Sequence, residues 1–125
     1  MIIHESEENY LEAIFLLYQV KGYVRSIDIA AYLHFSKPSV SRAIKNLKEK
    51  DYIVVDENGM ISLTKQGKEK AECIYERHKV LSDILISFGV EKEQAITDAC
   101  RIEHVISQES FDKIKEYFHI QNKKE

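Results

Sequence analysis

The chain has 125 residues, of which 44% are hydrophobic and 31% are charged, and its formal net charge is −3. That length admits one ordinary domain, or a small domain with a helical extension, and it excludes a large multi-domain enzyme. The apolar content excludes a disordered protein, and no apolar run is long enough for a membrane span. The N-terminus turns acidic at once, unlike a signal peptide, so we expect a cytoplasmic protein, with no membrane partner, whose Cys73 and Cys100 are reduced thiols.

The charges are separated along the chain. Residues 36–50 carry five Lys or Arg and one Glu, whereas residues 1–12 carry four Glu and no basic residue. Residues 91–110 hold five acidic and two basic side chains. One basic and two acidic segments predict two sites that attract partners of opposite charge.

Three helices are predicted in the first half of the chain. Residues 5–20 place Tyr10, Ala13, Ile14, Leu17 and Val20 at helical spacing behind an acidic first turn. A short helix follows within residues 25–35, with Ser26 as its expected N-cap and an apolar face formed by Ile29, Ala30 and Leu33.

The third predicted helix, within residues 36–50, has the strongest signals. Ser36 is the expected N-cap, and Pro38 stands in the first turn, where its missing N–H costs little. Its buried stripe is formed by Val40, Ile44 and Leu47. Residues 52–64 then form a β-branched run, a turn with Asn58-Gly59 and an alternating run, which together predict a two-stranded hairpin.

The second half is predicted to be entirely helical. Helices are expected over residues 66–88, 91–107 and 110–118, with Gly89 ending the first of them. The whole order predicts a mainly α fold: an N-terminal winged helix-turn-helix with a two-stranded wing in residues 1–65, followed by an all-helical domain in residues 66–125. The family resemblance described below implies that this second domain is the dimerisation domain.

The basic third helix has the chemistry of a DNA-recognition helix. Cations bind phosphates, and short polar side chains near the first turn reach base edges. Arg42 is the best candidate for bidentate contact with guanine, while Lys65 and Lys68 follow the wing and are placed to hold the DNA backbone. A Lys-rich face is often merely solvated, and it is the helix-turn-helix context that favours double-stranded DNA as the partner. The predicted DNA-binding residues are Ser36, Lys37, Pro38, Ser39, Ser41, Arg42, Lys45 and Lys48.

A second cluster has the chemistry of a metal site. Cys100, Glu103 and His104 stand at positions i, i+3 and i+4, which one helical turn brings together. Thiolate, carboxylate and imidazole suit a first-row divalent metal, although Cys is also commonly buried and Glu-His pairs are common on surfaces. His78 on the preceding helix, and the oxygen-bearing Glu8, Asn9 and Glu12 on the first helix, strengthen the hypothesis. His78 is also explained as an ordinary helix-packing histidine, and Glu8 and Glu12 as acidic residues that suit the dipole at the first turn of a helix.

Five motifs, "EENYLEAI", "SKPSVSRAI", "LTKQG", "ERHKVL" and "DACRIEHVIS", occur in this order. Over residues 6–118 the chain resembles the diphtheria toxin repressor family of metal-dependent transcriptional regulators, including its manganese branch. The resemblance implies a homodimer that binds palindromic operator DNA when loaded with Mn(II) or Fe(II) and represses metal-uptake genes. It also implies that the metal ligands are Asn9, Glu12, His78, Cys100, Glu103 and His104.

The expected metal stays open between Mn(II) and Fe(II). Asn9 stands where the manganese branch has Asp and the iron branch has Met; Cys100 resembles the iron branch and Glu12 the manganese branch. A thiolate favours softer or later metals, whereas Glu12 and Asn9 favour hard ones.

Two other classes of function share parts of this residue pattern. A small metalloenzyme would also combine His, Glu and Cys, but the chain has no glycine-rich loop or nucleophile motif, and a recognition helix would serve no purpose in it, so we expect no enzyme. A metal-independent winged-helix regulator that senses a thiol oxidant through Cys100 or Cys73, or a small molecule, remains the alternative.

Overall fold

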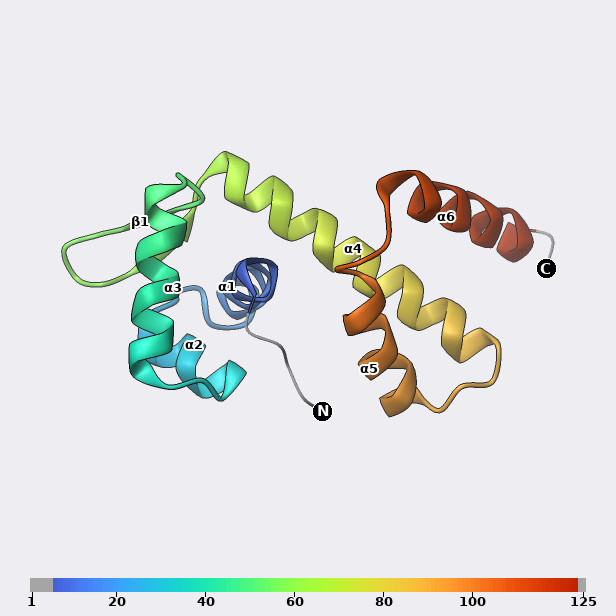
Figure 1. The fold of residues 1–125 in the computed structure, drawn as a ribbon, viewed down its shortest axis with the longest axis horizontal. Coiled ribbons are helices and arrows are strands. Elements are labelled where there is room, and N and C mark those ends of the chain that lie inside the picture. The colour runs from blue at the N-terminus through green and yellow to red at the C-terminus, as the bar shows by residue number, and fades with distance from the viewer. Residues whose placement is uncertain (1–5, 124–125) are drawn as a thin grey trace. The chain divides into compact units, whose positions relative to one another are not determined.

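The computed structural model describes residues 6–123, which form six helices and one two-stranded antiparallel sheet (Figure 1). The mainly α fold and the two-stranded wing are thereby confirmed. The chain divides into two compact units, one ending at Cys73 and one beginning at Ile74, and the boundary falls within α4 (Lys65–Ser87). The two units are described separately.

The first unit begins with α1 (Glu7–Lys21). Ser6 is its N-cap, with Oγ accepting the Asn9 N–H at 3.1 Å; Glu5, where the helix was predicted to start, lies outside the described residues. The expected buried stripe is correct except for Val20, which is 83% exposed. At 3.6 residues per turn, Val20 lies only about 20° around the helix from the buried Ala13, so its exposure does not come from the face on which it lies. Val20 stands in the last turn of α1, one residue before the helix ends.

The second helix, α2 (Ser26–Leu33), begins at a different cap from the predicted one. Arg25, rather than Ser26, is the N-cap, because the Asp28 carboxylate accepts the Arg25 backbone N–H at 2.9 Å. Asp28 also accepts a hydrogen bond from Lys21 Nζ at 2.6 Å. That hydrogen bond holds the pKa of Asp28 below its ordinary value.

Helix α3 (Lys37–Glu49) agrees closely with its prediction. Ser36 Oγ accepts the Ser39 N–H at 3.3 Å, and a proline stands in the first turn. The apolar stripe, Val40, Ile44 and Leu47, is buried in the core of the first unit. Since this stripe anchors α3, the opposite side of the helix is left for solvent or a partner.

The wing consists of β1 (Ile53–Val55) and β2 (Ile61–Leu63), with Ile53 opposite Leu63 and Val55 opposite Ile61. Asp56 shapes the connecting loop, because its Oδ1 accepts the N–H groups of Asn58 and Met60, both at 2.9 Å. The hairpin prediction is therefore confirmed.

Gly67 explains part of the "LTKQG" motif. A Cβ at this position would lie 2.0 Å from the carbonyl oxygen of Tyr52, which also accepts the Thr64 N–H at 3.0 Å. No side chain fits at that distance, so glycine is needed where the first turn of α4 meets the chain leading into the wing.

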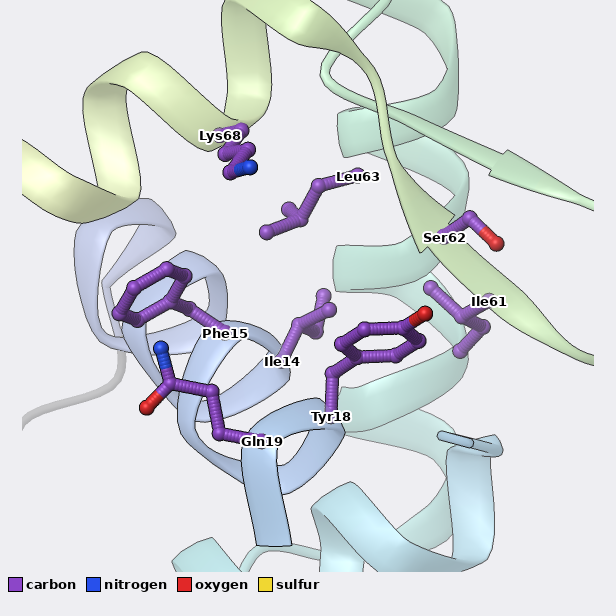
Figure 2. A pocket seen from close by; sticks show the side chains of 8 residues that line it. All are labelled: Ile14, Phe15, Tyr18, Gln19, Ile61, Ser62, Leu63 and Lys68. Carbon is purple, nitrogen blue, oxygen red and sulfur yellow. The ribbon is translucent and has the colours of Figure 1, made fainter. Parts of the chain in front are cut away.

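An open groove of about 350 Å³ lies between α1, β2 and the start of α4 (Figure 2). Its walls are mainly apolar, and Lys68 contributes an amine from α4. Lys68, predicted to hold the DNA backbone, is one of its lining residues, but none of the predicted metal ligands or predicted residues of the recognition helix lines it. The lining residues are Ile14, Phe15, Tyr18, Gln19, Ile61, Ser62, Leu63 and Lys68.

The second unit contains the rest of α4, α5 (Lys92–Ile102) and α6 (Gln108–Lys123). Its buried core is formed by Leu81, Ala99 and Phe111. On α6, Ile114 and Tyr117 remain 37% and 66% exposed. Within the described residues, no helix is both long and apolar enough to cross a membrane.

Helix α5 is shorter than predicted, and Glu103 and His104 follow it instead of lying within it. The Glu103 N–H still bonds to Ala99 O at 2.9 Å, but the N–H groups of Val105 and Ile106 both bond to Ile102 O at 3.0 Å. Beyond the end of α5, the carbonyl oxygens of Glu103 and Ile106 accept hydrogen bonds from Arg77 of α4.

Candidate metal centre and nucleic-acid interface

The solvent side of α3 presents the predicted DNA-binding residues. Seven of the eight are exposed: Ser36, Lys37, Pro38, Ser41, Arg42, Lys45 and Lys48. Among residues 6–123, the three lysines of this set form no ion pair with a carboxylate. Helix α3 therefore offers unneutralised positive charge on one face, as phosphate binding requires.

Ser39, the eighth residue, is half-buried and less available than predicted. Its Oγ accepts hydrogen bonds from Ser36 Oγ at 3.0 Å and from Arg42 Nη2 at 3.4 Å. These contacts orient the Arg42 guanidinium at the start of α3. Ser39 thus positions a neighbour, and its hydroxyl reaches a base edge only if these bonds rearrange.

The predicted ligand triplet comes together although the helix ends within it. Cys100 lies in the last turn of α5, and Glu103 and His104 follow directly. Their ligand atoms, a thiol sulfur, a carboxylate oxygen and a ring nitrogen, lie within 4.8 Å of one another. Glu103 keeps αR backbone geometry (φ −58°, ψ −25°), which preserves the helical spacing on which the prediction relied.

His78 of α4 contacts one member of this triplet. Its Nδ1 lies 2.9 Å from Oε2 of Glu103, within hydrogen-bond distance. Both residues belong to the second unit, which thus contains four of the six predicted ligands: the triplet Cys100, Glu103 and His104, and His78 in contact with Glu103.

The Glu103 side chain is fully buried, with 0% exposed. Its Oε1 lies 3.4 Å from Nε2 of His104 but accepts no hydrogen bond from any described residue. A buried carboxylate oxygen without a donor is costly unless a cation lies beside it. Together with a thiol and two imidazoles, this oxygen fits a first-row divalent metal.

The other two predicted ligands belong to α1 in the first unit. Asn9 is buried, with 4% exposed, and Glu12 is half-buried. They stand three positions apart, so both face the same side of α1. Their part in metal binding stays a prediction.

Glu7 shows how part of the acidic first turn is neutralised. Lys50 Nζ and Lys70 Nζ lie 2.5 and 3.2 Å from its carboxylate oxygens. Partial burial raises the pKa of Glu7, but the hydrogen bonds from the two lysines outweigh it and hold that pKa below its usual value. The negative charge at Glu7 therefore needs no metal.

Arg77 was not predicted to have a role at the site. It precedes His78, and its guanidinium donates to the backbone of the segment that carries Glu103. The only sequence signal was its place in "ERHKVL", because its acceptors are 26 or more positions away.

Two family models match consecutive parts of the chain. Residues 3–60 match the family model "Iron dependent repressor, N-terminal DNA binding domain". Residues 64–120 match "Iron dependent repressor, metal binding and dimerisation domain". The chain is 34% identical over 109 residues to the HTH-type transcriptional regulator MntR of Bacillus subtilis (strain 168) and of Bacillus velezensis, covering 87% of this chain and 77% of MntR.

Two solved structures show the same fold. IdeR of T. acidophilum is 30% identical with a TM-score of 0.79, over 93% of this chain and 55% of IdeR. The manganese regulator SloR is 23% identical with a TM-score of 0.83, over 93% of this chain and 54% of SloR. The chain thus spans about half the length of these two proteins. The family models and the MntR identity confirm the predicted resemblance: this chain belongs to the iron-dependent repressor family of metal-dependent helix-turn-helix transcriptional regulators.

Proposed function

We propose that this protein is a repressor that binds palindromic operator DNA as a homodimer when loaded with Mn(II) or Fe(II), and that it controls genes of metal-ion homeostasis. DNA reading resides in residues 1–65 and metal binding and dimerisation in residues 66–125. The protein meets its operator in the cytoplasm. The observation that carries the proposal is the buried Glu103 carboxylate amid a thiol and two imidazoles.

In this proposal His78, Cys100, Glu103 and His104 hold the metal, and Asn9 and Glu12 of α1 supply further ligands. The bound ion contributes the positive charge that the clustered carboxylates and thiolate require. Without it, Glu103 keeps the hydrogen-bond-distance contact with His78. Because ligands from both units join one ion, metal binding couples the α1 segment to the second unit.

The donor set supports both metals. The Cys100 thiolate favours Fe(II) and later metals, whereas the oxygens of Asn9 and Glu12 favour Mn(II). The relatives agree with this pair: SloR is described as a manganese regulator, and the matching family models are described as iron dependent. Fe(II) and Mn(II) are therefore the two ions to compare first.

For DNA, the proposal places α3 in the major groove. Arg42 pairs with a guanine edge, and Lys37, Lys45 and Lys48 bind phosphates, with Ser36, Pro38, Ser39 and Ser41 at the entry of the helix. A two-fold dimer presents two such helices to successive major grooves, about 34 Å apart, which makes the operator palindromic. The exposed Ile114 and Tyr117 of α6 support a dimer contact in the second unit.

Metal and operator binding are then coupled. A coupling of roughly 1–3 kcal/mol changes operator affinity by about 5- to 150-fold, and operator DNA must tighten metal binding by the same factor. That range is sufficient for a regulatory response.

An anisotropy titration against a pool of genomic DNA fragments tests the proposal. Wild type, Glu103→Ala and the control Glu109→Ala, which alters an exposed α6 carboxylate, are each measured with chelator, Mn(II), anaerobic Fe(II) and Zn(II). We expect binding only with metal, lost in Glu103→Ala and kept in the control. Binding that ignores both chelator and mutation would overturn the metal mechanism and favour a winged-helix regulator that senses a thiol oxidant or a small molecule.

A further inference from the structure

The segment between α5 and α6 carries two of the proposed ligands and has little regular structure. Glu103 and His104 lie in it, and α6 begins at Gln108. The N–H groups of Glu103, Val105 and Ile106 bond to the end of α5, the Ser107 carbonyl accepts the Phe111 N–H of α6, and Val105 is 82% exposed. A segment of this kind needs outside contacts to hold a fixed conformation.

Arg77 of α4 supplies those contacts. Its Nη1 donates to the carbonyl oxygens of Glu103 at 3.1 Å and Ile106 at 3.0 Å, and its Nη2 donates to Gln108 Oε1 at 2.8 Å. The guanidinium also lies 5.7 Å from the ring centroid of Phe111 on α6. One planar side chain thus joins the start, the end and the following helix of the segment.

Arg77 and His78 are consecutive residues of α4 that contact the backbone and the side chain of Glu103. Arg77 donates to its backbone carbonyl, and His78 lies 2.9 Å from its carboxylate. With its backbone fixed, the buried side chain has few alternative orientations. The carboxylate is thereby kept in place before any metal arrives.

We propose that Arg77 is a positioning residue for the metal centre. It fixes the 103–107 segment so that Glu103 and His104 are already in place for the ion, and it does not touch the ion itself. The inference rests on the proposed function, because it assumes that these residues bind metal. Groups that orient metal ligands typically contribute about 10- to 100-fold to metal affinity.

Arg77→Lys separates the geometry of this contact from its charge. An ammonium keeps the positive charge but lacks the planar fork that reaches three acceptors at once. Arg101→Lys is the matched control, since Arg101 is an exposed arginine on α5 just before the segment. Arg77→Met additionally removes the charge.

Co(II), titrated anaerobically in the presence of reductant, is a suitable probe because thiolate coordination gives a charge-transfer absorption that reports Cys100. We expect wild type and Arg101→Lys to bind Co(II) alike, and Arg77→Lys to bind about 10- to 100-fold more weakly. The melting temperature in chelator, measured in parallel, shows whether Arg77→Lys is folded. A folded Arg77→Lys with wild-type Co(II) affinity would overturn the inference and leave the proposed function intact, whereas wild type that binds no Co(II) would overturn both.

If Arg77→Lys fails to fold, wild type supplies the test. Hydrogen exchange in chelator should show protected Val105 and Ile106 amides, because the segment is fixed before metal binds. Amides that exchange freely in chelator and slow only with Co(II) would show that the metal, and not Arg77, orders the segment.

Discussion

Lys45→Gln tests whether α3 binds DNA phosphates. Lys45 is exposed on α3 and pairs with no carboxylate among residues 6–123, so its removal should change the stability of the fold by less than about 0.5 kcal/mol. In the proposed dimer it removes one phosphate contact from each subunit. The slope of log K against log salt should therefore become shallower by about 1.8, which corresponds to about 60-fold weaker binding, or roughly 2.5 kcal/mol, at 0.1 M salt.

The assay is an anisotropy titration with saturating metal at four or more salt concentrations. Lys113→Gln, which removes an exposed lysine from α6, serves as the control and should keep the wild-type slope. If Lys45→Gln also keeps that slope, Lys45 does not contact phosphate and the assignment of α3 as the recognition helix is wrong.

Three further predictions concern the metal, the α4 start and the α2 cap. At a metal concentration of about 100 times the wild-type dissociation constant, metal should stabilise wild type by roughly 2.7 kcal/mol. If Glu103→Gln binds metal about 100-fold more weakly, the same concentration stabilises it by only about 0.4 kcal/mol. The variant should therefore lose most of the metal-induced rise in melting temperature. A full metal-induced rise in Glu103→Gln would contradict the ligand role of Glu103. Gly67→Ala places a Cβ 2.0 Å from Tyr52 O and should lower the free energy of unfolding by about 1–3 kcal/mol in urea titrations; a neutral effect would show that this close approach is absent. Asp28→Ala should cost about 1 kcal/mol at pH 7. The hydrogen bond from Lys21 lowers the folded-state pKa of Asp28 below its ordinary value of 3.8. The stabilisation by Asp28 is therefore present above pH 3.8 and is lost as the pH falls through the folded-state pKa. The free energies of unfolding of wild type and variant should converge in acid, and a difference that stays constant with pH would refute the capping role of Asp28.

The elements predicted correctly were those with local causes. Ser36 and Pro38 mark the start of α3 within four positions of sequence, and the stripe at Val40, Ile44 and Leu47 needs no partner to be recognised. The wrongly predicted cap of α2 and end of α5 involve contacts that residue spacing alone did not indicate. Asp28 bonds to the Arg25 N–H, so that Arg25 caps α2, and beyond the end of α5 the chain bonds to Arg77 of α4.

The candidate site divides in the same way. Spacing alone brought Cys100, Glu103 and His104 together, because αR geometry continues one residue beyond the helix. The complete burial of Glu103 and the role of Arg77 could not be predicted. Both depend on contacts between segments that are distant in sequence, including contacts to backbone atoms. Residue types alone do not predict such contacts.

One side of α3 is buried in the core, and the other side is exposed. Its stability depends on three buried aliphatic residues, whereas the side chains offered to DNA are exposed. Substitutions on the outer side are therefore nearly free of folding cost, and mutation can explore new operator sequences without first endangering the fold. Divergence of operators among relatives, or deliberate retargeting in the laboratory, needs changes on only one side of a single helix.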